Sequence, residues 1–169
     1  EMQHRGISLQ KNDQEIFNNI SEKLGKLSTD FSNNVLDATN NWFLILNKKT
    51  EVDGLPERVL ELMAISAHNH LKKDEEVDIK NGPWKLSLDI PTYTSFMTYA
   101  TDRNLREKLY KAYVGRASQG EKNNSQIIEE ILSLRTKQAN ILGYKSWAEL
   151  SLSTKMAKDV ENVENLLEE

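Results

Sequence analysis

A stripe of apolar residues with helical spacing limits the fold of this chain more than any other feature of its sequence. Between about residue 13 and residue 41, apolar positions recur at steps of three or four: Ile16, Ile20, Leu24, Leu27, Phe31, Val35 and Ala38. Residues at this spacing share one face of an α-helix. Because the opposite face is polar, the sequence predicts a long helix that packs along one side against a partner surface.

Most of the remaining sequence also has a helical pattern. Pro56 opens a segment with apolar residues at helical spacing through Ala67, and Thr101 or Asp102 can cap a helix that reaches Tyr113. Further helices are predicted over residues 93–99, over residues 124–142, after a capping box at Ser146 and after Asp159. The inward face of the helix over 124–142 is expected to consist of Ile127, Ile128, Ile131, Leu132, Leu134, Ala139 and Leu142.

Two short segments have the pattern of β-strands. Residues 42–46 are aromatic and branched, and residues 84–88 alternate large apolar with polar side chains. We expect these segments to pair as a small two-stranded antiparallel ribbon, and the charged residues 72–82 to form an exposed loop. The predicted fold class is mostly α: a single helical domain over residues 1–169, built as a helical bundle lobe that carries this one ribbon.

Composition and charge exclude several classes of function. The sequence has 22 Lys and Arg against 26 Asp and Glu, which gives a net charge of −4 and no basic footprint for nucleic acid or anionic lipid. It has no cysteine, so disulfides, thiolate nucleophiles and cysteine metal sites are excluded. No apolar run approaches the roughly 20 residues that cross a bilayer. We therefore expect no nucleic-acid partner, no membrane span and an intracellular location.

We expect the chain to carry no complete catalytic centre of its own. None of the three histidines begins an H-E-x-x-H zinc motif. His68 and His70, with the acidic residues 74–76, are interpreted as a solvated helix end and not as a metal cluster. The glycines of segment 115–122 have the spacing of a phosphate loop, but Glu121 stands where the lysine is needed, so we interpret the segment as an interhelical turn.

Several tyrosines in the second half of the chain leave two readings open. They could line a peptide groove, but packing in the core with their hydroxyls at its rim is favoured. The tyrosines are Tyr93, Tyr99, Tyr110, Tyr113 and Tyr144.

A series of stretches points to one protein family. They are residues 27–39, 54–57, 88–93, 105–107, 130–135, 142–144 and 155–157, together with Met97, Tyr110, Tyr113, Arg116 and Ala117. In this order they resemble the N-terminal helical region of the oligopeptidase A and thimet oligopeptidase family of zinc metallopeptidases. The resemblance covers about residues 6–169 and is nearer to the bacterial and plant-organellar oligopeptidase A branch.

The resemblance implies a lobe of an almost wholly helical, clam-like enzyme that degrades short peptides in a deep channel. The family's zinc motif, its third zinc ligand and its catalytic tyrosines belong to the C-terminal part, and this sequence ends before them. No catalytic, cofactor-binding or metal residue is therefore carried over to this chain, zinc is expected only in complete family members, and the peptide-binding residues stay unassigned.

Three functions follow as hypotheses. In the first, the chain is the non-catalytic N-terminal lobe of such an oligopeptidase and forms part of the wall of the substrate channel. In the second, it is a stand-alone truncated paralogue that acts through self-association, peptide binding or association with a full-length oligopeptidase. A third is a metal-binding regulator built on His68 and His70. The expected compartment is the cytosol, or the chloroplast or mitochondrion after removal of a transit peptide.

Overall fold

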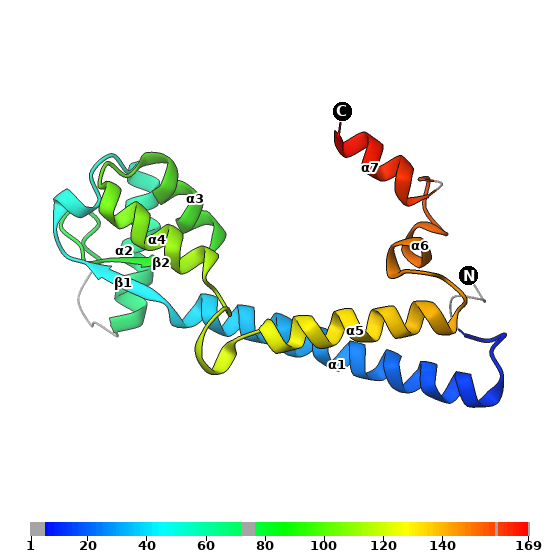
Figure 1. Ribbon diagram of the computed structural model, residues 1–169. Helices are drawn as coiled ribbons and strands as arrows, with labels where there is room; N and C mark the ends of the chain where they lie inside the picture. The colour runs from blue at the N-terminus through cyan, green and yellow to red at the C-terminus, as the bar shows by residue number, and fades with distance from the viewer. Residues whose placement is uncertain (1–5, 72–76, 158, 169) are drawn as a thin grey trace. The chain divides into compact units, whose positions relative to one another are not determined.

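The structure is a computed structural model that describes residues 6–71, 77–157 and 159–168. Over these residues it is mostly α-helical, with a single two-stranded antiparallel sheet, which confirms the predicted fold class (Figure 1). The elements are α1 (Lys11–Asn41), β1 (Phe43–Leu46), η2 (Lys49–Glu51), α2 (Glu57–Leu71), β2 (Trp84–Ser87), α3 (Ile90–Tyr99), α4 (Arg103–Val114), η3 (Gly120–Lys122), α5 (Ser125–Ile141), α6 (Trp147–Leu152) and α7 (Val160–Glu168).

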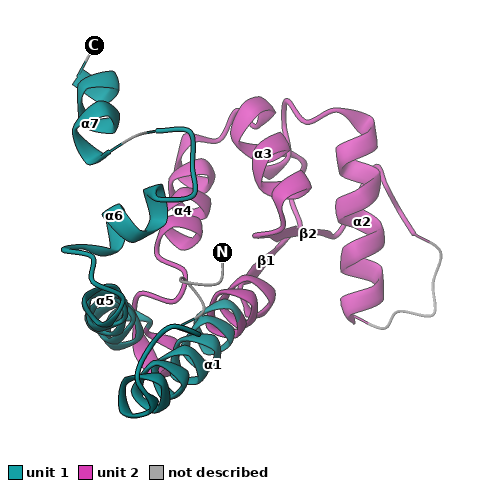
Figure 2. Cartoon of the chain, turned by 90° about the vertical axis from the view of Figure 1, so that its right-hand side faces the viewer, with its two compact units in different colours: residues 1–32, 124–169 teal, residues 33–123 magenta. Residues whose placement is uncertain are grey.

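The contacts of the chain divide into two compact units (Figure 2). Unit 1 consists of residues 1–32 and 124–169, and unit 2 of residues 33–123. Helix α1 therefore contributes its first two-thirds to unit 1 and its last turns to unit 2. The expectation of one helical domain over residues 1–169 stays a prediction, and each unit is described by itself below.

Unit 1 is built on the antiparallel pair formed by α1 and α5. Its small core contains the buried Ile20, Leu27 and Leu134, with four partly buried apolar residues around them: Leu24, Ile127, Ile131 and Ile141. Polar contacts fix how the two helices align: the Gln138 amide donates to the Ser21 hydroxyl at 2.9 Å, and Lys23 forms an ion pair with Glu130.

The predicted faces of the two long helices need correction. On α1, Ile16 is exposed and its neighbour Phe17 is buried instead, because the preceding segment folds back so that Gly6 lies against the Phe17 ring. On α5, Ile128 and Leu132 were expected to face inward, but their side chains are 45% and 57% exposed. Within unit 1, the partner of α5 covers only one side of the helix, so the apolar stripe of α5 is wider than the surface that buries it.

The last two helices of unit 1 begin at the predicted caps. The Ser146 hydroxyl accepts a hydrogen bond from the Glu149 N–H at 3.1 Å, and the Asp159 carboxylate accepts one from the Asn162 N–H at 2.9 Å. Helix α7 has no buried side chain, and Leu166 and Leu167 are strongly exposed. Of the described helices, none is long and apolar enough to cross a membrane.

Unit 2 is a ribbon covered by helices. Strands β1 and β2 pair in antiparallel register, with Phe43 opposite Ser87 and Leu46 opposite Trp84, which confirms the predicted ribbon to within one residue at its ends. The alternating side chains of β2 bury Trp84 and Leu86, because every second residue of a strand faces the same side. These two residues share one core with residues of α2, α3 and α4 that include Met63, Ala64, Phe96, Leu105 and Leu109.

Aspartate caps explain where α3 and α4 begin. Helix α3 begins at Ile90, three residues earlier than predicted, because the Asp89 carboxylate accepts a hydrogen bond from the Thr92 N–H at 3.0 Å. Asp102 caps α4 in the same way, by accepting from the N–H groups of Asn104 and Leu105. The expected helix starts after Pro56 and near residue 124 are confirmed.

Candidate functional site

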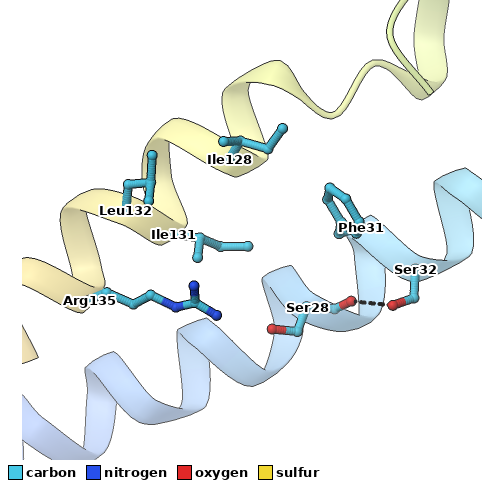
Figure 3. A pocket seen from close by; sticks show the side chains of 7 residues that line it. All are labelled: Ser28, Phe31, Ser32, Ile128, Ile131, Leu132 and Arg135. Carbon is cyan, nitrogen blue, oxygen red and sulfur yellow. Dashed lines mark hydrogen bonds between the residues drawn. The ribbon is translucent and has the colours of Figure 1, made fainter. Parts of the chain in front are cut away.

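Unit 1 has a groove between α1 and α5 with a volume of about 310 Å³. Figure 3 shows its lining side chains, with Ile131 and Arg135 reaching from α5 toward α1 and Phe31 rising from α1. We call this the helix-pair groove; its seven lining residues are Ser28, Phe31, Ser32, Ile128, Ile131, Leu132 and Arg135.

The chemistry of the helix-pair groove suits an apolar binding partner and not catalysis. The Ser32 hydroxyl is engaged, because it donates to the Ser28 carbonyl at 2.9 Å. Arg135, the one charged lining residue, lies with its Cζ 5.2 Å from the centre of the Trp147 ring. A nucleophile would need an adjacent base, and none of the lining residues is a histidine or a carboxylate.

Unit 2 has a cavity of about 330 Å³ beside the turn that follows α4. We call this the basic cavity, because Lys111, Arg116 and Lys122 line it together with apolar walls from Trp42 and Leu88. Both volumes lie at the small end of the range for ligand sites, about 300 to 1,000 Å³. The basic cavity can therefore hold one small group or one end of a larger ligand.

Two of the three cations of the basic cavity have carboxylate partners. Lys111 pairs with Glu107 at 2.6 Å, and Lys122 pairs with Asp37 at 2.7 Å. The hydrogen bond to Asp37 and the charge of that carboxylate raise the pKa of Lys122 above its ordinary value, so the lysine is fully protonated at neutral pH. The third cation, Arg116, lies over the Tyr113 ring, with its Cζ 3.6 Å from the ring centre.

The structure separates the tyrosines that the sequence grouped together. Tyr93 and Tyr113 are partly buried against the core of unit 2 and stack with ring centres 3.9 Å apart. Tyr99 and Tyr110 are about half exposed. Tyr110 lines a third pocket of about 270 Å³ with Met97, Arg103, Arg106 and Glu107. Neither reading of the tyrosines therefore applies to all of them.

The histidines predicted as a solvated helix end lie in the last turn of α2. His70 is exposed and meets the Phe43 ring edge to face, with centres 4.3 Å apart. Within the described residues, no three His, Cys, Asp or Glu side chains form a group that could hold a metal ion. The acidic residues 74–76 lie outside the described residues, so the reading of this segment, and the assignment of no catalytic or metal residue, stay predictions.

Segment 115–122, whose glycines have the spacing of a phosphate loop, is a turn followed by the short helix η3. The interhelical turn is thus confirmed. What the sequence did not reveal is that this turn brings Arg116 and Lys122 to the wall of the basic cavity. The resemblance singled out Arg116 and Ala117, but no local pattern indicated that Trp42, more than seventy positions earlier, would line the same cavity.

Known proteins resemble the chain over nearly its whole length. The family model described as peptidase family M3 matches residues 96–169. The probable cytosolic oligopeptidase A and the chloroplastic and mitochondrial organellar oligopeptidase A of Arabidopsis thaliana are each 45% identical over 96% of this chain. Oligopeptidase A of Haemophilus influenzae is 39% identical over 96% of it. The chain spans 23%, 20% and 23% of the lengths of these three relatives.

Proposed function

We propose that this chain, which belongs with the oligopeptidase A proteins of peptidase family M3, acts as the N-terminal lobe of such a metallopeptidase. In this role it forms part of the wall of the substrate channel and does not cleave peptides itself. The observation that carries the proposal is the 45% identity over 96% of the chain to two oligopeptidase A relatives. The compartment proposed with it is the cytosol, the chloroplast or the mitochondrion, since the names of these relatives give those locations.

The chemistry of the chain supports a non-catalytic role. A zinc peptidase holds its metal with three protein ligands and leaves a position for water. The 169 residues contain only three histidines and no H-E-x-x-H. The described residues include no cluster of metal ligands. The described residues therefore offer no ligand set for zinc, and in this proposal no step of peptide hydrolysis is assigned to the chain.

A cleavage assay and a chimera test the two parts of this proposal. The pure chain, with and without added zinc, should not cleave a short quenched-fluorescent peptide, while a trace of complete oligopeptidase A serves as the positive control. Cleavage that rises with zinc and stops with a chelator would overturn the non-catalytic role.

The chimera replaces the matching segment of a complete oligopeptidase A with this chain. It should cleave short peptides and still reject an unfolded protein of about one hundred residues, because the wall limits access by size. A folded, zinc-loaded chimera that degrades the long substrate as readily as the short peptide would overturn the role as channel wall.

A second candidate function, that of a self-associating interaction protein, is favoured by the helix-pair groove. Its rim carries the exposed side chains of Ile128 and Leu132, and exposed apolar surface of this kind usually finds a partner. In this version a second copy of the chain covers the groove. Sedimentation at increasing concentration should then show a dimer that Leu132→Lys weakens, with Leu62→Lys, a similarly exposed position on α2 in unit 2, as the control. A monomer at every concentration would eliminate this candidate.

A further inference from the structure

The basic cavity carries an excess of positive charge within its own walls. Lys111, Arg116 and Lys122 line it, and none of its described lining residues is an aspartate or a glutamate. Glu107 and Asp37, which do not line the cavity, are each engaged by one of these lysines. Arg116 is the lining cation that forms no ion pair with a carboxylate among the described residues.

The guanidinium of Arg116 has donors to spare. Its Nε donates to the Tyr113 carbonyl at 2.8 Å, and one terminal nitrogen donates to the Thr39 hydroxyl at 3.1 Å. These are its hydrogen bonds within the described part of unit 2. An arginine has five N–H donors in a planar fork, so the second terminal nitrogen and one further N–H stay available for a planar anion.

The position of this guanidinium is fixed before any ligand arrives. Arg116 stacks on one side of the Tyr113 ring, and Tyr93 stacks on that ring with the two planes 18° apart. One face of a ring has room for only one of these groups at such distances, so they occupy opposite faces. A side chain that is already ordered loses little rotamer freedom on binding, which favours affinity.

The backbone beside Arg116 is held in an uncommon conformation. Ala117 is buried and has a φ of 51°, in the left-handed region that residues with a Cβ rarely adopt. Strained residues persist where the surrounding structure holds them, and they gather at ligand sites. At Gly115, a Cβ would come within 2.9 Å of the Lys111 carbonyl, so the turn also needs its glycine. This turn sets the direction in which Arg116 leaves the backbone.

We propose that Arg116 binds the carboxylate of a short peptide in the basic cavity. The inference rests on the proposed function, which brings short peptides to this lobe, and it adds a binding position and a chemical preference. The carboxylate can come from the C-terminus of the peptide or from an acidic side chain, since both offer two oxygens that match the guanidinium fork. Trp42 and Leu88 supply the apolar wall against which the adjoining side chain packs.

Calorimetric titration of the full chain with matched peptides tests the inference. The probes are acetyl-Ala-Ala-Leu with a free carboxylate, the same peptide as its C-terminal amide, and acetyl-Ala-Glu-Leu amide. We expect the free acid to bind at least about tenfold more tightly than the neutral amide, which corresponds to the strength of a hydrogen bond to a charged group. Recovery of binding by the glutamate peptide identifies a side-chain carboxylate as an equal source; no recovery restricts the site to C-termini.

Variants assign the preference to the guanidinium. Arg116→Gln should remove the difference between acid and amide, and Arg116→Lys should reduce it, because lysine keeps the charge but lacks the fork. Arg103→Gln, which removes an exposed arginine of the same unit outside the basic cavity, should leave the difference unchanged. If Arg116→Gln does not fold, the acid-against-amide comparison on the unaltered chain still decides.

Three results would overturn the inference. They are equal affinity for acid and amide, equal loss of binding in Arg103→Gln and Arg116→Gln, and competition by inorganic phosphate at the same concentration as the peptide. Each of them leaves the proposed function standing, because the chimera measures that function independently. Failure of the chimera with a preserved acid preference would reject the channel wall and keep the carboxylate site.

Discussion

The side-chain amide of Gln138 on α5 donates a 2.9 Å hydrogen bond to the hydroxyl of Ser21 on α1. Gln138 is only 8% exposed, so its amide has little access to water. Ser21→Ala removes the acceptor and leaves a buried donor unsatisfied. We expect a loss of about 1 to 3 kcal/mol in the free energy of unfolding, measured by urea denaturation.

Ser32→Ala is the matched control for this prediction. Ser32 lies on the same helix and, like Ser21, donates to the carbonyl four residues earlier, but it is exposed. Its replacement should change stability by no more than about 0.5 kcal/mol. Adding Gln138→Leu to Ser21→Ala should recover part of the loss, because the unsatisfied amide is gone. Equal losses for Ser21→Ala and Ser32→Ala would contradict the role of the buried amide.

Gly54 lies where two backbone segments of unit 2 come close together. Its φ is +85°, and a Cβ at this position would come within 2.3 Å of the Tyr99 carbonyl oxygen. The same turn is held by a hydrogen bond from the Thr101 N–H to the Asp53 carbonyl at 3.0 Å, so it cannot move away freely. Gly54→Ala should therefore lower the free energy of unfolding by about 2 kcal/mol or more.

Gly25→Ala is the comparison for Gly54→Ala, because it should change the free energy of unfolding in the opposite direction. Gly25 lies within α1 in ordinary helical backbone, with nothing within 4 Å of the added Cβ. Alanine at this position should stabilise the chain by up to about 1 kcal/mol, because glycine is the poorer helix former. If both substitutions shifted the urea midpoint in the same direction, the steric argument for Gly54 would fail.

The cap of α3 should make part of the stability depend on pH. Burial acts to raise the pKa of Asp89, but hydrogen bonds from the Ser87 hydroxyl and the Thr92 N–H outweigh it, and the pKa lies below its ordinary value. The folded chain therefore binds fewer protons at this group than the unfolded chain. This contribution is complete above the unfolded pKa of about 3.9 and is lost as the pH falls through the lower folded value.

Asp89→Asn isolates that contribution. Asparagine caps a helix about as well as aspartate but has no carboxyl group to titrate. Stability measured by urea denaturation between about pH 6 and about pH 2.5 should fall less steeply for Asp89→Asn than for the unaltered chain on the acid side. Parallel curves for the two proteins would show that Asp89 does not carry this dependence.

Local sequence patterns predict most helices and strands of the fold. Where such a prediction is wrong, a tertiary contact explains the difference. The helix over residues 13–41 follows from its apolar period, and the ribbon follows from alternation and turn residues. The choice between Ile16 and Phe17 could not be made this way, since both lie near the same stripe. What buries Phe17 is the segment around Gly6, which folds back over the ring.

The candidate sites were harder to predict than the fold. The apolar period of α5 predicts that Ile128 and Leu132 face inward, because a sequence does not show how wide the opposing surface is. The basic cavity joins the end of α1 to the turn after α4, and neither segment carries a recognisable ligand motif. The family resemblance includes Arg116, but the stacking of Arg116 on Tyr113 depends on packing that no spacing rule describes.

Unit 2 is one continuous segment of the chain, inserted between the two parts of unit 1. Segment 33–123 leaves unit 1 within α1 and returns at the start of α5, where the Asn124 side chain donates to the Phe31 carbonyl at 3.1 Å. Its entry and exit points are thus neighbours, as in insertions that other scaffolds tolerate. A substitute for segment 33–123 would therefore have to begin and end at neighbouring positions, and it would have to continue the helix α1, which contributes residues to both units.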